Sequence, residues 1–121
     1  VVRDADKKDL KEIARTCKEL GQKARNSKLT LDDVSGGTFT VSSMGMYNTD
    51  IITPIVNTPE VGILGVGVIR EKPAVYNGQI VTRHIMHLSM TVDHQAVDGA
   101  PAMEFAVYVG SLLENPYLLF V

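Results

Sequence analysis

The stretch VGILGVGVIR, residues 61–70, is apolar as far as its final arginine and is rich in valine and isoleucine. A short run of this composition is typical of a β-strand that is buried on both faces. Its glycines follow the pattern G-x-x-G-x-G, which differs from the dinucleotide-binding pattern and does not precede a helix. Gly62, Gly65 and Gly67 are therefore expected to be bulges or points where the backbone lies close to other atoms.

Further strand signals lie on both sides of this run. Residues 38–42 are mostly β-branched or aromatic and predict a short strand. The pair Asn77-Gly78 predicts the tight turn of a hairpin, whose second arm is expected to continue as one long strand to about Val92. Residues 44–58 contain glycine, asparagine and the pair Thr53-Pro54, and they end at the threonine of Thr58-Pro59, which favours an irregular connection.

Helical signals lie toward the two ends of the chain. From Asp6 to Ala24, apolar residues recur at intervals of three and four, with charged residues between them, as in a solvated amphipathic helix. Residues 30–33, TLDD, resemble a capping box that opens a short helix. Pro101 and Asn115-Pro116 bracket the last predicted helix. This order of elements predicts an α+β fold, a two-layer sandwich of a mixed β-sheet with helices on one face.

The composition restricts the class of protein. The chain has 121 residues, 45% of them hydrophobic and 6% aromatic, which is enough for one domain at most. Its longest apolar stretches are far shorter than the roughly 18 residues that a membrane span needs, so no membrane association is expected. The single cysteine, Cys17, cannot form an internal disulfide, which favours a reducing compartment.

The charges are distributed unevenly. Nine of the 12 basic residues lie within residues 1–28, and no lysine or arginine follows Arg83. The C-terminal third is therefore expected to lie in a core or in a subunit interface. The basic residues occupy one amphipathic stretch without interleaved aromatic residues, so nucleic acid is not an expected partner.

Three histidines are candidates for chemistry. His84 and His87 lie three residues apart on a predicted strand and so point to opposite faces, which excludes a shared metal. His94 follows the predicted strand and stands four residues before Asp98 and just ahead of a helix, a position that suits a held general base. The segment lacks a cysteine or a helical histidine pair, so no metal is expected.

Residues 93–100, DHQAVDGA, resemble the D-H-x-x-x-D-G signature of the dihydrolipoyl acyltransferases of 2-oxo acid dehydrogenase complexes, which share a fold with chloramphenicol acetyltransferase. The likeness extends over the whole chain, through GTFTVSSMG (37–45), TPIVN (53–57), PEVGILG (59–65) and LENP (113–116). The resemblance implies a chloramphenicol acetyltransferase-like fold. It also implies transfer of an acyl group, expected to be acetyl as in the pyruvate dehydrogenase complex, between dihydrolipoamide and coenzyme A.

The resemblance assigns roles to three residues. His94 is the base that removes the thiol proton, and an imidazole is suited to this near neutral pH. Ser42 is the hydroxyl that donates to the oxyanion, with Ser43 as the neighbour in reserve. Asp98 holds the loop and His94. Coenzyme A and lipoamide are substrates, the lipoamide being carried on another domain, and no metal takes part.

The resemblance also implies partners. In this family the site lies between adjacent subunits of a homotrimer, and trimers build larger cores with the other subunits of the complex. Residues 117–121, YLLFV, resemble the family's anchor between trimers, while the alternative is a terminal strand folded onto its own core. The expected location is the cytoplasm in a prokaryote and the mitochondrial matrix in a eukaryote.

Two departures leave other functions open. Gln95 stands where the family commonly has arginine, and the family's catalytic domain is longer than this chain. Residues 1–121 are therefore expected to be the C-terminal portion of that domain, incomplete at the N-terminus. The alternatives are a non-catalytic assembly module of such a complex, or an acetyl-CoA-dependent acetyltransferase that acts on a small hydroxylated substrate.

Overall fold

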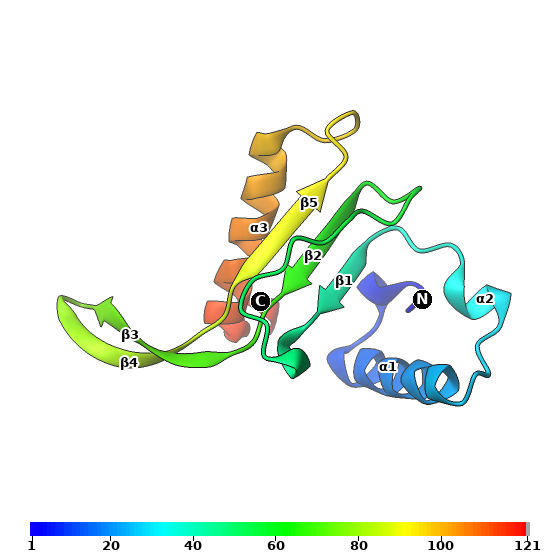
Figure 1. Ribbon diagram of the computed structural model, residues 1–121, viewed down its shortest axis with the longest axis horizontal. Coiled ribbons are helices and arrows are strands. Elements are labelled where there is room, and N and C mark those ends of the chain that lie inside the picture. Colours follow the sequence, from blue (N-terminus) through cyan, green and yellow to red (C-terminus); the bar gives the residue numbers. More distant parts are fainter. Residues whose placement is uncertain (121) are drawn as a thin grey trace. The chain divides into compact units, whose positions relative to one another are not determined.

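A computed structural model describes residues 1–120, which form two compact units, one from Val1 to Thr38 and one from Phe39 onward (Figure 1). The first unit is helical and the second contains every strand found in the described residues. No helix within residues 1–120 is long and apolar enough to cross a membrane.

The first unit is built from two capped helices. The long helix α1 spans Leu10–Arg25 and starts later than the apolar spacing from Asp6 predicts, because the Asp9 carboxylate and the Glu12 side chain form a capping box there. A single turn of 3-10 helix, η1, covers Ala5–Lys7. The short helix α2 spans Leu31–Val34, and its capping box pairs Thr30 with Asp33, as the sequence predicts.

The second unit contains a three-stranded mixed sheet. Its strands are β1 (Thr40–Ser43), β2 (Gly62–Val66) and β5 (Leu88–Val92), in the order β1-β2-β5. Strand β1 runs parallel to β2, and β5 runs antiparallel to β2. Helix α3, Gly99–Glu114, packs against β5. The mixed sheet with a covering helix confirms the predicted α+β class.

A separate hairpin extends from this sheet. Strands β3 (Arg70–Tyr76) and β4 (Gln79–Ile85) pair only with each other in the described sheet topology, and they form the curved arm at the left of Figure 1. Asn77 and Gly78 form its turn with positive φ angles of 50° and 76°, as the Asn-Gly pair predicts. Short 3-10 turns, η2 (Gly45–Tyr47) and η3 (Pro116–Phe120), complete the unit.

Two predicted strands are wrong in their extent. Residues 61–70 do not form one strand, because β2 ends at Val66 and the chain turns into the hairpin at Arg70. The long strand predicted from the hairpin to Val92 is broken at Met86 and His87. Ile85 pairs within the hairpin whereas Leu88 pairs with β2, so the two residues between them carry the chain from one sheet to the other.

The glycines within β2 and directly after it confirm the expected close approaches. A Cβ on Gly65 would lie 2.6 Å from Cγ1 of Ile52, and one on Gly67 would lie 2.0 Å from the carbonyl oxygen of Asp50. A carbon atom cannot come this close without displacing its neighbour. The irregular segment that follows β1 therefore packs directly over the end of β2, where only glycine leaves it room.

The core of the second unit is small. Ile63, Leu64 and Ala102 are the buried apolar residues, and Phe39 packs edge-on against Phe105 at 5.6 Å between ring centroids. Many large apolar side chains remain exposed, including those of the C-terminal turn, which forms 3-10 helix η3 instead of a strand. Val121, the last residue of the predicted anchor, lies outside the described residues.

Candidate functional site

The turn that holds His94 is fixed by the residue before it. Asp93 donates its backbone N–H to the carbonyl of Val61 at 2.9 Å, which ties the end of β5 to the start of the neighbouring strand. Its carboxylate accepts from the N–H of Gln95 at 2.9 Å, and its carbonyl accepts from Ala96 and Val97. These four bonds leave the backbone around His94 little freedom, so the imidazole projects from a rigid turn.

His94 and Asp98 lie together, as their spacing predicts. Nδ1 of His94 is 3.8 Å from Oδ1 of Asp98, which is an ion-pair separation and longer than a hydrogen bond. The Asp98 carboxylate does not cap helix α3, although the residue stands at its N-cap, so it remains available to the imidazole. The two side chains are 74% and 86% exposed, and such a pair steers a ring more than it stabilises the fold.

Ser42 lies far from His94 in the same chain. It pairs with Gly65, which pairs with Ser89 near the start of β5, whereas His94 follows the other end of that strand. Val92 is therefore two strands across and three residues along from Ser42, a separation of roughly 14 Å at ordinary strand spacing and rise. The opposite directions of β1 and β5 are visible in Figure 1. One chain does not bring the serine and the histidine together.

The other two histidines form separate contacts. Nε2 of His84 lies 3.6 Å from the Glu71 carboxylate on the exposed hairpin, and Nδ1 of His87 lies 3.5 Å from Oδ1 of Asp50. Within residues 1–120, no group of three or more histidine, cysteine, aspartate or glutamate side chains is placed to hold a metal ion.

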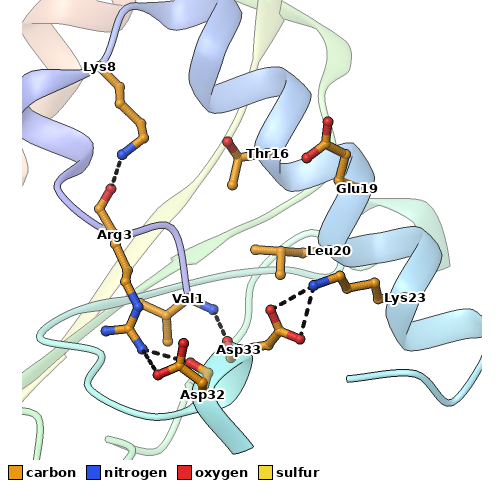
Figure 2. A pocket seen from close by; sticks show the side chains of 9 residues that line it. All are labelled: Val1, Arg3, Lys8, Thr16, Glu19, Leu20, Lys23, Asp32 and Asp33. Carbon is orange, nitrogen blue, oxygen red and sulfur yellow. Dashed lines mark hydrogen bonds and ion pairs between the residues drawn. The ribbon is translucent and has the colours of Figure 1, made fainter. Parts of the chain in front are cut away.

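The first unit has a polar hollow of about 260 Å³ between its N-terminal segment, α1 and α2 (Figure 2). Four of its charged side chains form two ion pairs with one another. Nζ of Lys23 lies 3.0 Å from the Asp33 carboxylate, and Nη2 of Arg3 lies 3.1 Å from that of Asp32. Figure 2 shows each pair side by side: Lys23 joins α1 to α2, and Arg3 joins the N-terminal segment to α2.

Hydrogen bonds to the Asp33 carboxylate explain its acidity. The backbone N–H of Thr30, the ammonium of Lys23 and the Thr30 hydroxyl lower the pKa of Asp33 from 3.8 to about 2, in that order of effect. The carboxylate is therefore ionised at neutral and mildly acidic pH, and its ion pair with Lys23 links α2 to α1.

One polar cluster was not predicted from the sequence. Asp50, in the irregular segment after β1, accepts a hydrogen bond from Nζ of Lys72 at 2.9 Å and lies near Arg70 and His87. Its pKa is lowered chiefly by the hydrogen bond from Lys72. These partners lie far from Asp50 in sequence, and no local pattern around position 50 indicates them.

The fold and these residues define a class of protein. A mixed sheet with a covering helix, a His-x-x-x-Asp turn between the last strand and that helix, and a serine on the parallel edge strand together describe a chloramphenicol acetyltransferase-like acyltransferase domain. Solved structures share the fold. The Azotobacter vinelandii dihydrolipoamide acetyltransferase superposes on 96% of this chain and 48% of its own, with a TM-score of 0.90 and 39% identity.

The chain belongs to the family described as 2-oxoacid dehydrogenases acyltransferase (catalytic domain), which it matches over residues 1–121. This confirms the resemblance seen in the sequence. The cubic core of a pyruvate dehydrogenase multienzyme complex gives the same TM-score of 0.90, at 38% identity over 96% of this chain and 48% of that one. A curated relative, the succinyltransferase component of the 2-oxoglutarate dehydrogenase complex of Bartonella vinsonii subsp. berkhoffii, is 46% identical over 116 residues.

The matches cover this chain almost entirely but the relatives only in part. The chain spans 28% of the Bartonella protein and about half of each solved catalytic chain. The activities of those longer proteins therefore apply to this chain only as proposals.

Proposed function

We propose that this chain is part of an acyltransferase that moves an acyl group between dihydrolipoamide and coenzyme A, with His94 as its base. The observation that carries the proposal is the His94–Asp98 pair on a turn fixed by Asp93, in a chain of the acyltransferase family. An exposed imidazole on a rigid turn can reach a thiol that enters from solvent.

In the proposed reaction, one proton moves from the coenzyme A thiol to His94 and then to the departing dihydrolipoamide thiolate. The His94 imidazole takes the proton of the coenzyme A thiol, and the thiolate attacks the thioester carbonyl of acyl-dihydrolipoamide. The tetrahedral oxyanion accepts a hydrogen bond from the Ser42 hydroxyl. When the intermediate collapses, the C–S bond to dihydrolipoamide breaks, and the departing thiolate takes the proton from the imidazolium.

The Azotobacter structure supports these roles. It was determined to investigate a serine, a histidine and an asparagine in the mechanism of that acetyltransferase. The serine precedes the histidine there by the same number of residues as Ser42 precedes His94, and the asparagine follows the histidine by four residues, as Asp98 follows His94. An amide cannot act as a carboxylate base, so the shared position fits a residue that orients the imidazole, as proposed for Asp98.

The site proposed here needs two chains. The sheet register separates Ser42 from His94 within one chain, so the serine of one copy would meet the histidine of another. The many exposed apolar side chains offer the surface for such contacts. We therefore propose a homotrimer that builds a larger core with the other subunits of a 2-oxo acid dehydrogenase complex, with η3 as an anchor between trimers.

The acyl group expected from the sequence differs from the acyl group that the curated relative transfers. The sequence suggested acetyl and a pyruvate dehydrogenase complex, and the solved structures carry those descriptions. The curated relative is more similar in sequence and is a succinyltransferase of a 2-oxoglutarate dehydrogenase complex. We propose succinyl as the transferred group, and the comparison of succinyl-CoA with acetyl-CoA as donors to dihydrolipoamide decides between them.

Acyl transfer by the full-length protein tests the proposal. His94→Ala is expected to lower kcat by roughly 10²- to 10⁴-fold, which is the usual contribution of a positioned base. His84→Ala removes an exposed histidine of the hairpin and is the matched control, with activity unchanged. Equal activity in the His94 variant and the parent would contradict the assignment of the base.

Two further outcomes identify the alternatives. A parent protein that assembles into a trimer but never transfers an acyl group would be an assembly module. Acetylation of a small hydroxylated acceptor by acetyl-CoA, without transfer to dihydrolipoamide, would identify the third candidate.

A further inference from the structure

Three basic side chains of the second unit lie close to the carboxylate of Asp50. Arg70 and Lys72 lie two residues apart on one face of β3, and His87 lies at the junction between β4 and β5. Nζ of Lys72 donates to Oδ2 of Asp50 at 2.9 Å, and Nε of Arg70 lies 3.8 Å from Oδ1. Asp50 is thus the one carboxylate that faces all three basic side chains among the described ion pairs.

The backbone around Asp50 is tied to the same elements. Nη2 of Arg70 donates to the carbonyl of Asn48 at 2.9 Å, and the N–H of Val68 donates to the carbonyl of Thr49 at 2.9 Å. The carbonyl of Asp50 itself lies against Gly67, where a Cβ would come within 2.0 Å of it. The segment from Asn48 to Asp50 is therefore held from the hairpin side and from the end of β2.

A buried contact within the cluster is incompletely satisfied. Oδ1 of Asp50 and Nδ1 of His87 are both buried and have no hydrogen-bond partner among the described residues, although they lie 3.5 Å apart. Both polar atoms lose solvent when the segment sits in place, which is unfavourable by itself. Lys72 and Arg70, the two cations that contact the Asp50 carboxylate, offset that cost when the carboxylate is charged.

This segment follows the proposed oxyanion donor directly. Strand β1 ends at Ser43, one residue after Ser42, and Met44 donates its N–H to the carbonyl of Val66. Only η2, Gly45–Tyr47, separates that bond from the held segment. Only a few residues therefore separate Asp50 from the strand end that carries Ser42.

We infer that Asp50 is a positioning residue for Ser42: its carboxylate anchors the segment after β1 to the base of the β3–β4 hairpin and thereby fixes the direction of the serine hydroxyl. The inference rests on the proposed function for its effect on catalysis. The anchoring itself is a property of the fold and can be measured without the reaction.

Hydrogen exchange in the full-length protein tests the anchoring. In Asp50→Asn, the amides of Val68 and Met44 should exchange at least tenfold faster than in the parent, because the bonds they donate to the segment and to β2 open more often. Glu71→Gln is the matched control, since Glu71 is an exposed carboxylate on the same hairpin that contacts only His84 among the described ion pairs. Unchanged exchange at both amides in Asp50→Asn would overturn the inference.

Kinetics separate a positioning role from a merely structural one. Asp50→Asn should lower kcat by roughly tenfold with little change in KM, as expected for a donor moved out of line with the oxyanion. In a Ser42→Ala background, the same substitution should have no further effect on kcat, because the hydroxyl that it positions is gone. Asp50→Glu, which keeps the charge, should restore part of the activity and guards against a variant that does not fold.

The outcomes distinguish the two proposals. A further tenfold loss on the Ser42→Ala background would show that Asp50 acts through the fold in general and would overturn the positioning role. A parent protein without acyl transfer would remove the proposed function, while faster exchange in Asp50→Asn would still support the anchor.

Discussion

The chemistry proposed at the residue scale depends on where each side chain is held. His94 is exposed, and it gains its direction from the bonds of Asp93 and from the nearby Asp98 carboxylate. Ser42 is half-buried on an edge strand, and successive residues of a strand point to opposite faces. The neighbour Ser43 is therefore aimed away from any group that Ser42 contacts.

The serine that donates to the oxyanion can be identified by substitution. Ser42→Ala is expected to lower kcat roughly 10²- to 10³-fold, the usual effect of removing one oxyanion donor. Ser43→Ala should leave kcat within about twofold, because its hydroxyl lies on the other face of β1. Steady-state acyl transfer measures both, and a larger loss in the Ser43 variant would reverse the assignment.

Local sequence patterns indicated the candidate residues, whereas their separation within one chain was implied only by the family resemblance. The nearness of His94 and Asp98 and the presence of a strand around Ser42 were predicted correctly, since each is a local pattern, although the strand spans Thr40–Ser43 instead of residues 38–42. Whether Ser42 and His94 meet depends on the strand register, which local patterns do not encode. The Asp50 cluster was missed because its contacts join residues about 20 to 37 positions apart in a segment predicted only as an irregular connection.

At the scale of elements, the predicted hairpin turn and the start of α2 were correct, whereas the start of α1 and the strand lengths were not. The Thr30–Asp33 capping box and the Asn77-Gly78 turn both formed as predicted, because their bonds lie within a few residues. The breaks after Val66 and at His87 occur inside apolar or β-prone runs. There the chain passes from one sheet to the other, and no periodicity signals such a change.

The stability of the contact between α1 and α2 should depend on pH, because Asp33 pairs with Lys23 there. Its folded pKa, about 2, lies below the ordinary value of 3.8, so its stabilising effect is complete above about pH 4 and is lost as the pH falls through 2. Lys23→Ala should move the carboxyl titration of Asp33 upward, toward 3.8, as followed by NMR. Lys18→Ala, in the same helix, is the control and should leave the titration where it is.

The close approach at the end of β2 predicts a strong effect of one methyl group. Gly67→Ala should lower the free energy of unfolding by about 1–3 kcal/mol or more, because its Cβ would overlap the carbonyl of Asp50. Gly110→Ala in α3 meets nothing within 4 Å and should stabilise the helix slightly. Denaturant unfolding compares the two, and equal stability of both variants would contradict the packing described here.

At the scale of the whole molecule, the second unit exposes many large apolar side chains, which a larger assembly would cover. Its buried apolar residues are few, and the exposed ones include Ile51, Ile80, Tyr117 and Phe120. The region without lysine or arginine, after Arg83, contains both His94 and η3. These features fit a chain that contributes half of a site to each of two neighbours.

The most direct test of this account is complementation between two inactive variants. Ser42→Ala and His94→Ala, produced separately as full-length proteins, should each have less than about one hundredth of the parent activity. When the two chains are co-expressed and assemble together, some interfaces join an intact Ser42 to an intact His94, so acyl transfer should return to a substantial fraction of the parent rate. If mixed assemblies form, as shown by mass, and remain as inactive as either variant alone, the serine and histidine act within one chain and the proposed site is wrong.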